Sequence, residues 1–324
     1  MRAAIYDRFG VAEEVLRVVD LEMPEPGPGE VRVAVKVSGV NPTDWKLRVP
    51  AAGRNMAFPF QVPNQDGAGV IDKVGPGVDP GRVGERVWLH FTAHQRQFGA
   101  AEQFVCVPER LAAQLPDGAS FELGASLGIP ALTAHYALFC HGPLTDKAVL
   151  VPGGAGAVGH FAIELARWKG ARVISTVSSP EKAELARKAG ADVVFNYRSD
   201  DLRARIRELE PDGVDRILEV APENFELDLD LIRTGGTILF YASTDANPVM
   251  PVRPLMTLNA TLCFMLLYTV EPSAIARGIV DLNAAMKAGA LSELPTVRFS
   301  LEQITDAHRA VENGAVGKVL IDLD

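Results

Sequence analysis

The fold is decided by residues 147–177, which read KAVLVPGGAGAVGHFAIELARWKGARVISTV. An apolar strand signal at 147–151 precedes a glycine-rich turn, and apolar residues at helical spacing follow over 158–169. A second strand signal comes at 172–177. Strand, turn, helix and strand in this order predict a βαβ unit, and therefore a parallel sheet with helices on its faces.

The glycine-rich turn has the pattern G-x-G-x-x-G and consists of Gly154, Ala155, Gly156, Ala157, Val158 and Gly159. Glycines allow the backbone to turn tightly and to approach a ligand closely. The free N–H groups and the positive dipole at the start of the following helix then favour an anion. In this context the turn predicts binding of a dinucleotide pyrophosphate rather than an ordinary strand–helix connection.

The end of the second strand bears on which dinucleotide binds. An NAD site usually places Asp or Glu there, about 20 residues beyond the loop, to bind the ribose hydroxyls. This chain reads STVSS at 175–179 and has no carboxylate before Glu181, which we expect in the first turn of the next helix. Small hydroxyl side chains leave room for a 2′-phosphate and Lys182 supplies positive charge, so we predict NADP(H).

The flanking segments extend this pattern. After the βαβ unit, strand signals at 192–195, 216–220 and 237–241 alternate with helical stretches, which predicts a doubly wound sheet. Before it, short strand signals between Gly/Pro turns, such as the alternation of valines over 31–37, predict a β-rich, barrel-like domain. Two further helical stretches and a strand at 318–323 close the chain.

Composition and charge narrow the class of protein. The chain has 324 residues, 48% hydrophobic and 23% charged, which is typical of a soluble protein of about two domains. A net charge of −9 disfavours nucleic acid and anionic membranes as main partners. We expect no secretion signal and no membrane span, because the most apolar run, 260–270, is too short. Cys106, Cys140 and Cys263 are far apart, which favours simple burial in a reducing, cytoplasmic compartment.

Motifs spread over nearly the whole chain resemble those of the zeta-crystallin-like quinone oxidoreductases, zinc-free members of the medium-chain dehydrogenases/reductases. They are MRAAIYDRF at 1–9 with EVL at 14–16, GVNPTD at 39–44, DGAGV at 66–70, PALTA at 130–134, the glycine loop, GAD at 190–192, NYR at 196–198 and GKVL at 317–320. The resemblance implies a Rossmann cofactor domain at 121–264, inserted in a GroES-like catalytic domain formed by 1–120 and 265–324.

The same resemblance implies a set of cofactor-binding residues. The residues expected near the nicotinamide are Asn41, Thr133, Tyr241, Ser243, Phe264, Met265 and Lys318. Those expected around the adenosine phosphate are Ser178, Lys182 and Tyr197, and Lys46 completes the set. Simpler structural roles stay open for several of them: Asn41 can shape the turn before its proline, Thr133 can start a helix, and Tyr197 and Phe264 can be core aromatics.

The chain lacks the ligands that related zinc alcohol dehydrogenases use. A catalytic zinc needs cysteine or histidine ligands, but Asn41 stands at the place of the first cysteine and Gln65 at that of the histidine. Residues 90–110 contain a single cysteine, too few for a structural zinc lobe, and His90 and His94 have no evident third ligand. We therefore expect no metal, and reduction of an acceptor that is already electron-poor.

Three functions remain open. The first is transfer of hydride from NADPH to a quinone, by a one- or two-electron route, which needs little beyond positioning, so no catalytic acid is assigned. The second is NADPH-dependent reduction of the C=C bond of an enal, enone or enoyl thioester, although 45–60 lack the tyrosine that related enoyl reductases carry. The third is an NADPH-binding structural or RNA-associated role, which the acidic charge disfavours. The apolar segment 258–268 favours a homodimer over burial within one chain.

Overall fold

The computed structural model describes residues 1–51, 53–244 and 248–323. The chain forms two compact units. One, here called the terminal unit, consists of Met1–Ile129 and Glu293–Asp324. The other, the central unit, consists of Pro130–Ser292. A single continuous insertion therefore separates the two parts of the terminal unit.

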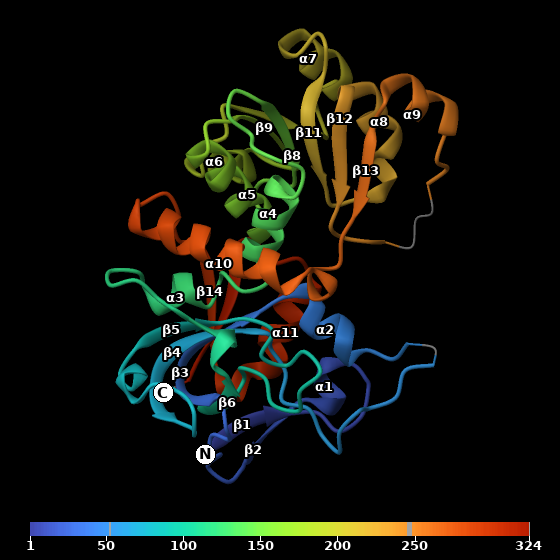
Figure 1. Cartoon of the computed structure of the whole chain (residues 1–324). Coiled ribbons are helices and arrows are strands. Elements are labelled where there is room, and N and C mark those ends of the chain that lie inside the picture. The colour runs from blue at the N-terminus through green and yellow to red at the C-terminus, as the bar shows by residue number, and fades with distance from the viewer. Residues whose placement is uncertain (52, 245–247, 324) are drawn as a thin grey trace. The chain divides into compact units, whose positions relative to one another are not determined.

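The central unit contains a six-stranded sheet in the order β10-β9-β8-β11-β12-β13 (Figure 1). Its strands are β8 (Ala148–Pro152), β9 (Arg172–Val177), β10 (Val193–Asn196), β11 (Val214–Glu219), β12 (Ile232–Phe240) and β13 (Thr261–Phe264). All neighbouring pairs are parallel. The chain runs outward from β8 to β10 and then returns to β11, so the direction of winding reverses between β8 and β11. This confirms the predicted doubly wound sheet.

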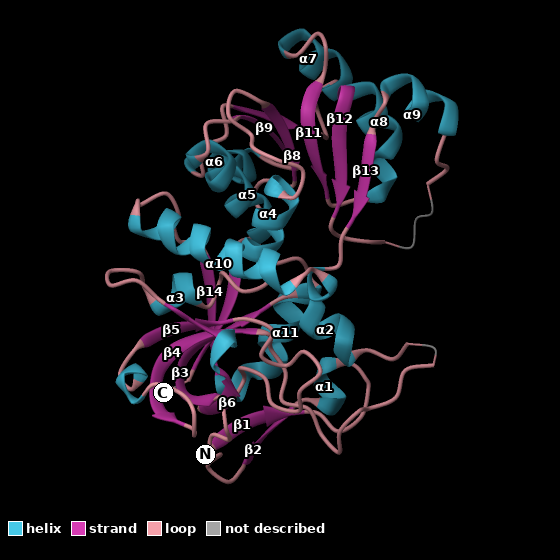
Figure 2. Cartoon of the chain, in the orientation of Figure 1, coloured by secondary structure: helices cyan, strands magenta, loops and turns pink. Residues whose placement is uncertain are grey.

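Helices cover both faces of this sheet, with α4, α5 and α6 on one face and α7, α8 and α9 on the other (Figure 2). Their bounds are α4 (Pro130–Phe139), α5 (Ala157–Trp168), α6 (Pro180–Lys188), α7 (Leu202–Leu209), α8 (Phe225–Leu231) and α9 (Val252–Leu258). Helix α6 begins as its sequence predicts, because the Ser179 side chain caps the N–H of Lys182 and Pro180 is the first helical residue. Phe161 and Leu165 of α5 are fully buried.

The terminal unit contains a seven-stranded sheet in the order β14-β15-β3-β4-β5-β7, with β6 also paired to β3. Its strands are β3 (Glu30–Val40), β4 (Asp66–Val74), β5 (Arg86–Leu89), β6 (Phe104–Pro108), β7 (Ala112–Gln114), β14 (Thr296–Ser300) and β15 (Lys318–Asp322). Val31, Val33 and Val35 of β3 are buried, as their alternation predicts. Around the sheet lie β1 (Arg2–Ile5), β2 (Arg17–Asp20), α1 (Ala12–Val15), α2 (Pro42–Arg48), α3 (Phe121–Gly124) and α11 (Ile304–Glu312).

The unit boundaries differ from those expected at 120/121 and 264/265. The larger difference has a clear cause in helix α10 (Pro272–Lys287), which packs on α4 within the central unit. Gly278 allows this approach, because a Cβ there would lie 3.0 Å from Leu132 and 3.2 Å from the His135 ring. The central unit therefore continues to Ser292.

The apolar segment 258–268 contains β13, the last strand of the sheet. Apart from the buried Leu267, its residues are only partly covered, and Phe264 is 64% exposed. None of the helices in the described parts of the chain is both long enough and apolar enough to span a membrane.

Candidate functional site

The glycine loop lies at the carboxyl end of β8 and leaves no space for a side chain at two of its three glycines. A Cβ on Gly154 would lie 2.0 Å from Ser175 Oγ, and one on Gly159 would lie 2.4 Å from the Gly153 carbonyl oxygen. A Cβ on Gly156 would meet only that same oxygen, at 3.3 Å. Gly154 and Gly159 are thus required for packing of the loop, whereas Gly156 presents a bare backbone surface to a ligand.

Helix α5 starts in this loop with Gly156 as its N-cap residue. The N–H groups of Ala157, Val158 and Gly159 belong to the first turn, where no preceding carbonyl of the helix can accept their hydrogen bonds. Together with the helix dipole they form a site for an anion. The loop and the helix start therefore fit a dinucleotide pyrophosphate, which they would hold through backbone N–H groups.

A cavity of about 450 Å³ lies beside this loop. It opens at the carboxyl ends of β8, β9, β10 and β11, where ligands of doubly wound sheets bind. Its lining includes Gly153, Thr176, Tyr197, Val220, Asn224 and Leu227. The Tyr197 N–H donates to the Val177 carbonyl at 3.0 Å, which holds this residue next to the end of β9.

The residues predicted to select NADP(H) lie around the same strand ends. Ser178 directly follows β9, and Lys182 is half-buried in the first turn of α6. Tyr197 is 51% exposed and lines the cavity, so it is not a core aromatic. Glu181 is exposed in the first turn of α6, as expected, and its own backbone N–H and Ser179 lower its pKa.

Two buried carboxyl groups form part of the cavity wall, and the sequence did not single them out. Glu219, the last residue of β11, accepts hydrogen bonds at Oε1 from the N–H groups of Val220 (2.7 Å) and Ala221 (2.6 Å) and from Asn224 Nδ2 (3.2 Å). Burial and the adjacent Glu219 raise the pKa of Asp228, on α8, to about 9. Because Glu219 has three donors, it is the ionised member, and protonated Asp228 donates to it.

Of the remaining predicted residues of the central unit, four lie at the ends of strands and one, Thr133, lies in a helix. Tyr241 and Ser243 follow β12, and Phe264 and Met265 stand at the end of β13, so all four lie at the carboxyl edge that carries the glycine loop. Phe264 stacks on Phe240 with ring centroids 5.2 Å apart. Thr133 is buried in α4, which packs beside α5.

The terminal unit contains a buried charge cluster, defined here as Asn41, Asp44, Asp66 and Lys318. Asn41 is the N-cap residue of α2, and its Nδ2 donates to Asp66 Oδ2 at 2.7 Å. Lys318 Nζ donates to Asn41 Oδ1 at 2.6 Å and to Asp66 Oδ2 at 3.3 Å. Asp44 accepts the N–H groups of Asn41 (2.7 Å) and Gln65 (3.1 Å). The side-chain amide of Asn41 thus bridges the Lys318 ammonium and the Asp66 carboxylate.

The charges of this cluster nearly balance. Burial, together with the charge of Asp66, raises the pKa of Asp44 to about 8. Burial also raises the pKa of Asp66 and lowers that of Lys318, while their mutual attraction opposes both shifts. One ammonium group therefore compensates two acids, of which Asp44 is the more readily protonated.

This donor set does not fit a catalytic zinc ion. Asn41 stands where a first ligand would be needed, and its amide is already bonded on both sides. The Lys318 ammonium occupies the space next to it and would repel a divalent cation. Gln65 offers an amide oxygen, which is a weak zinc ligand compared with imidazole or thiolate.

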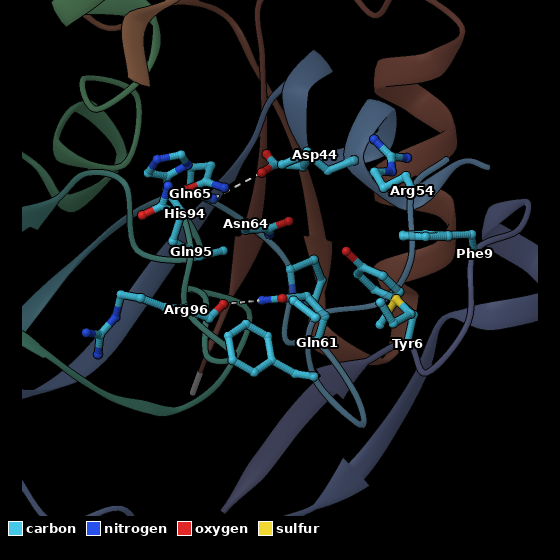
Figure 3. Close-up of a pocket in the computed structure, with 16 residues that line it drawn as sticks. Tyr6, Phe9, Asp44, Arg54, Gln61, Asn64, Gln65, His94, Gln95 and Arg96 are labelled. Atoms are coloured by element: carbon cyan, nitrogen blue, oxygen red, sulfur yellow. Dashed lines mark hydrogen bonds between the residues drawn. The ribbon is translucent and has the colours of Figure 1, made fainter. Parts of the chain in front are cut away.

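A second cavity, of about 260 Å³, lies within the terminal unit (Figure 3). Tyr6, Phe9 and Arg54 lie on one side of it, and Gln65 and His94 on the other. Much of its lining comes from two segments, residues 54–58 and 93–96. The Arg54 guanidinium lies 4.7 Å from the centre of the Phe9 ring.

The lining of this second cavity suits a weakly polar molecule. Its accessible lining is mainly carbon, from Tyr6, Phe9, Met56 and Phe58 among others. Gln65 Oε1 is buried and has no hydrogen-bond partner among the described residues, so it can accept one from a ligand. Lys46, by contrast, is exposed on α2 with its ammonium 5.9 Å from the Trp45 ring centre, outside both the cavity lining and the charge cluster.

Two kinds of comparison place these features among known proteins. Residues 27–117 match the family described as "Alcohol dehydrogenase GroES-like domain", and residues 157–283 match "Zinc-binding dehydrogenase". The chain is 30% identical to the quinone oxidoreductase of Lama guanicoe, covering 99% of this chain and 97% of the relative. It is 29% identical to the human quinone oxidoreductase, with the same coverage. It is 32% identical to a 2-haloacrylate reductase of Burkholderia, covering 95% and 94%.

Solved structures agree in fold over the full length. A mycobacterial protein, Rv1454c, complexed with NADPH is 30% identical and has a TM-score of 0.86, with 99% of this chain and 100% of that chain covered. The quinone oxidoreductase of Escherichia coli complexed with NADPH is 25% identical and has a TM-score of 0.85 at the same coverage. The GroES-like assignment of the terminal unit and the Rossmann assignment of the central unit are thereby confirmed.

Proposed function

The chain belongs to the zeta-crystallin-like quinone oxidoreductases of the medium-chain dehydrogenase/reductase family, and from this premise we propose that it reduces quinones with NADPH. The observation that carries the proposal is the combination of a bare pyrophosphate-binding loop with a strand end that lacks an acidic residue. Full-length likeness to quinone oxidoreductases and to NADPH complexes supports it.

Bound NADPH supplies a hydride from its nicotinamide ring. The protein's own contribution is to bind and orient. The N–H groups of Ala157, Val158 and Gly159 would hold the pyrophosphate, and Ser178, Lys182 and Tyr197 would surround the 2′-phosphate. Tyr241, Ser243, Phe264 and Met265, at the same sheet edge, would line the nicotinamide end. A quinone needs little activation, so its position and the exclusion of competing reactions suffice.

Calorimetry with NADPH and NADH tests the cofactor part of this proposal. Binding of NADPH at least about tenfold tighter than NADH is expected, which corresponds to roughly 1.4 kcal/mol. Steady-state reduction of 9,10-phenanthrenequinone with NADPH tests the acceptor part. Preference for NADH, or no turnover of any quinone with NADPH bound, would overturn the proposal.

One observation favours reduction of C=C bonds as a second activity. Tyr6 lines the cavity of the terminal unit, and burial raises the pKa of its hydroxyl to about 12, so the group stays protonated at neutral pH. Reduction of an alkene conjugated to a carbonyl requires a proton after hydride addition, and such a hydroxyl can donate it. Tyr6 would then be the proton donor, although it lies outside 45–60, the segment in which related enoyl reductases carry a tyrosine.

A matched pair of substrates separates the two activities. Tyr6→Phe removes only the hydroxyl, so it should slow reduction of a 2-alkenal or crotonyl-CoA by about 10²-fold, the usual contribution of a general acid. Reduction of 9,10-phenanthrenequinone should change little in the same variant. Equal loss with both substrates would rule out a role for Tyr6 as proton donor.

The assembly we infer is a homodimer. Strand β13 is the last strand of its sheet, and apolar side chains around it are exposed, including Val252 (67%), Met256 (75%), Phe264 (64%) and Leu266 (60%). An uncovered edge strand with apolar neighbours favours association. Light scattering after size-exclusion chromatography tests this, and a monomer at micromolar concentration would contradict it.

The compartment we infer is the cytoplasm. The three cysteines are free thiols, which suits a reducing compartment.

A further inference from the structure

Three potential metal ligands lie close together in the central unit. They are Cys140 and His141, directly after α4, and Cys263, in β13. The two sulfur atoms and an imidazole nitrogen all lie within 4.8 Å of one another. The sequence predicted simple burial for both cysteines, but in the structure each is only partly buried. In the described part of the chain this is the one group of three or more such side chains found close together.

The backbone around the three residues is firmly held. The Cys140 N–H donates to the Tyr136 carbonyl at 3.0 Å, which extends the hydrogen bonding of α4. Arg216 of β11 is buried and donates to the Leu138 carbonyl and, at 3.1 Å, to that of His141, so it fixes the end of the helix. On the other side, Cys263 lies in register with Leu239 of β12. The backbone at both cysteines is thus fixed by hydrogen bonds or strand pairing. These contacts of α4, β11, β12 and β13 hold the two thiols close together.

We propose that Cys140, His141 and Cys263 form a binding site for a thiophilic d¹⁰ metal ion, of the class of Zn²⁺ and Cd²⁺. Two thiolates and an imidazole are the ligands this class prefers. Zinc–sulfur bonds of about 2.3 Å in tetrahedral geometry place ligand atoms roughly 3.7 Å apart. The observed group needs only small side-chain rotations to reach that spacing.

The surroundings allow an ion to enter and to complete its coordination. His141 is exposed, so the group opens to solvent on its side, and water can supply a fourth ligand. An ion bound here would connect the end of α4 to the edge strand β13. It would also lie far in sequence from Asn41 and Gln65, the positions used by zinc in related dehydrogenases.

The two thiols must lose their protons when an ion binds. Burial and the adjacent Cys263 thiol raise the pKa of Cys140 to about 11, so the ion displaces the proton of this thiol rather than meeting a preformed thiolate. The Arg216 guanidinium acts in the opposite direction on Cys140, because its positive charge lowers the pKa of that thiol. Binding should therefore release protons and strengthen as pH rises.

A disulfide between the two cysteines is the competing use of this pair, and His141 distinguishes the two. A disulfide requires only the sulfur atoms, whereas a metal site gains its third ligand from the imidazole. His141 is on the surface, so His141→Gln should leave folding intact. The variant therefore tests the metal site without a change in the two thiols.

The experiment is titration of the full-length protein with Cd²⁺ in a phosphine reductant, followed by the ultraviolet thiolate-to-cadmium charge-transfer band. We expect one Cd²⁺ per chain, and Cd²⁺ should displace Zn²⁺ from protein loaded with zinc beforehand. The band should vanish in Cys140→Ser and in Cys263→Ser and should persist in Cys106→Ser, the control, whose thiol lies on β6 of the terminal unit. His141→Gln should weaken binding by at least about tenfold, the scale of losing even an indirect partner of a ligand.

Two results would overturn the proposal. One is the absence of a charge-transfer band at stoichiometric Cd²⁺ in the reduced wild-type protein. The other is a band of unchanged intensity and affinity in His141→Gln, because the pair would then bind without its third ligand. As an independent readout, Zn²⁺ should raise the Tm of the wild type and of Cys106→Ser but not that of Cys263→Ser.

Discussion

Each unit of the molecule buries a pair of carboxyl groups, but the two pairs are neutralised in different ways. In the terminal unit, the Lys318 ammonium bonds to Asp66 and, through Asn41, closes the charge cluster. In the central unit, Glu219 and Asp228 share a proton, and no lysine or arginine of the described chain hydrogen-bonds to either. In the terminal unit, the Lys318 ammonium fills the space between the polar groups. In the central unit, the shared proton neutralises the pair without a lysine or arginine side chain, so the cavity beside it stays open.

Removal of the internal cation should have the largest effect. Lys318→Met leaves Asp44 and Asp66 buried without their counter-charge, so we expect a loss of about 3–5 kcal/mol in the free energy of unfolding, measured by urea denaturation. Lys36→Met, on an exposed position of β3, is the matched control and should change stability by less than about 0.5 kcal/mol. The double variant Lys318→Met with Asp66→Asn should recover part of the loss. Equal stability of the two single variants would show that the cluster does not depend on its cation.

The shared proton should appear as a pH dependence of stability. The pKa of Asp228 is about 9 in the folded protein, against 3.8 for a free aspartate side chain. Its contribution to stability is therefore complete below the lower value and is lost as pH rises toward 9, by up to about 1.4 kcal/mol per pH unit. Asp228→Asn cannot release this proton, so its Tm should fall less than that of the wild type between pH 6 and 9.

Asp230→Asn is the control for that series. Asp230 is on the same helix, but it forms an exposed ion pair with Arg203. Its removal should leave the slope of Tm against pH unchanged. If Asp228→Asn and the wild type showed the same slope, the proton would have to be held elsewhere.

The same two regions show how far the sequence predicts the structure. The glycine loop, the strand before it and the helix after it are local, so their pattern predicted the central sheet and the start of α5 and α6. The charge cluster joins positions 41, 44, 66 and 318, which only the completed sheet brings together. The sequence marked Asn41 and Lys318 through a resemblance to known proteins, but not the bonds between them.

Long-range packing also explains what the sequence did not predict. The continuation of the central unit to Ser292 depends on the contact of α10 with α4, two helices that are far apart in the sequence. Cys140 and Cys263 appeared unrelated because the crossovers of a doubly wound sheet separate them. Glu219 could have been found, because the last residue of a strand at the carboxyl edge of such a sheet faces the ligand site.

A pair of glycine substitutions should sharpen the contrast between a closed and an open site. In Gly39→Ala the new Cβ would lie 2.0 Å from the Ala125 carbonyl oxygen and 2.9 Å from Lys318 Cε, so the charge cluster must shift. We expect a loss of about 1–3 kcal/mol of stability. In Gly156→Ala the Cβ would meet only the Gly153 oxygen, at 3.3 Å, so stability should be nearly unchanged while NADPH affinity falls by about tenfold or more. Unchanged NADPH binding in Gly156→Ala would mean that the loop does not hold the pyrophosphate.

The smallest expected effect concerns a lysine whose role is opposite to that of Lys318. Lys182 is half-buried at the start of α6, next to the strand end that lacks an acidic residue, and is available to a ligand rather than committed to the fold. Lys182→Met should leave stability within about 0.5 kcal/mol of the wild type and weaken NADPH binding about five- to tenfold, or roughly 1 kcal/mol. NADH affinity should not change, because NADH has no 2′-phosphate, and Lys188→Met at the other end of α6 should change neither. Calorimetry with both nucleotides measures the difference, and a parallel loss of NADH affinity would mean that Lys182 supports the pocket rather than recognising the phosphate.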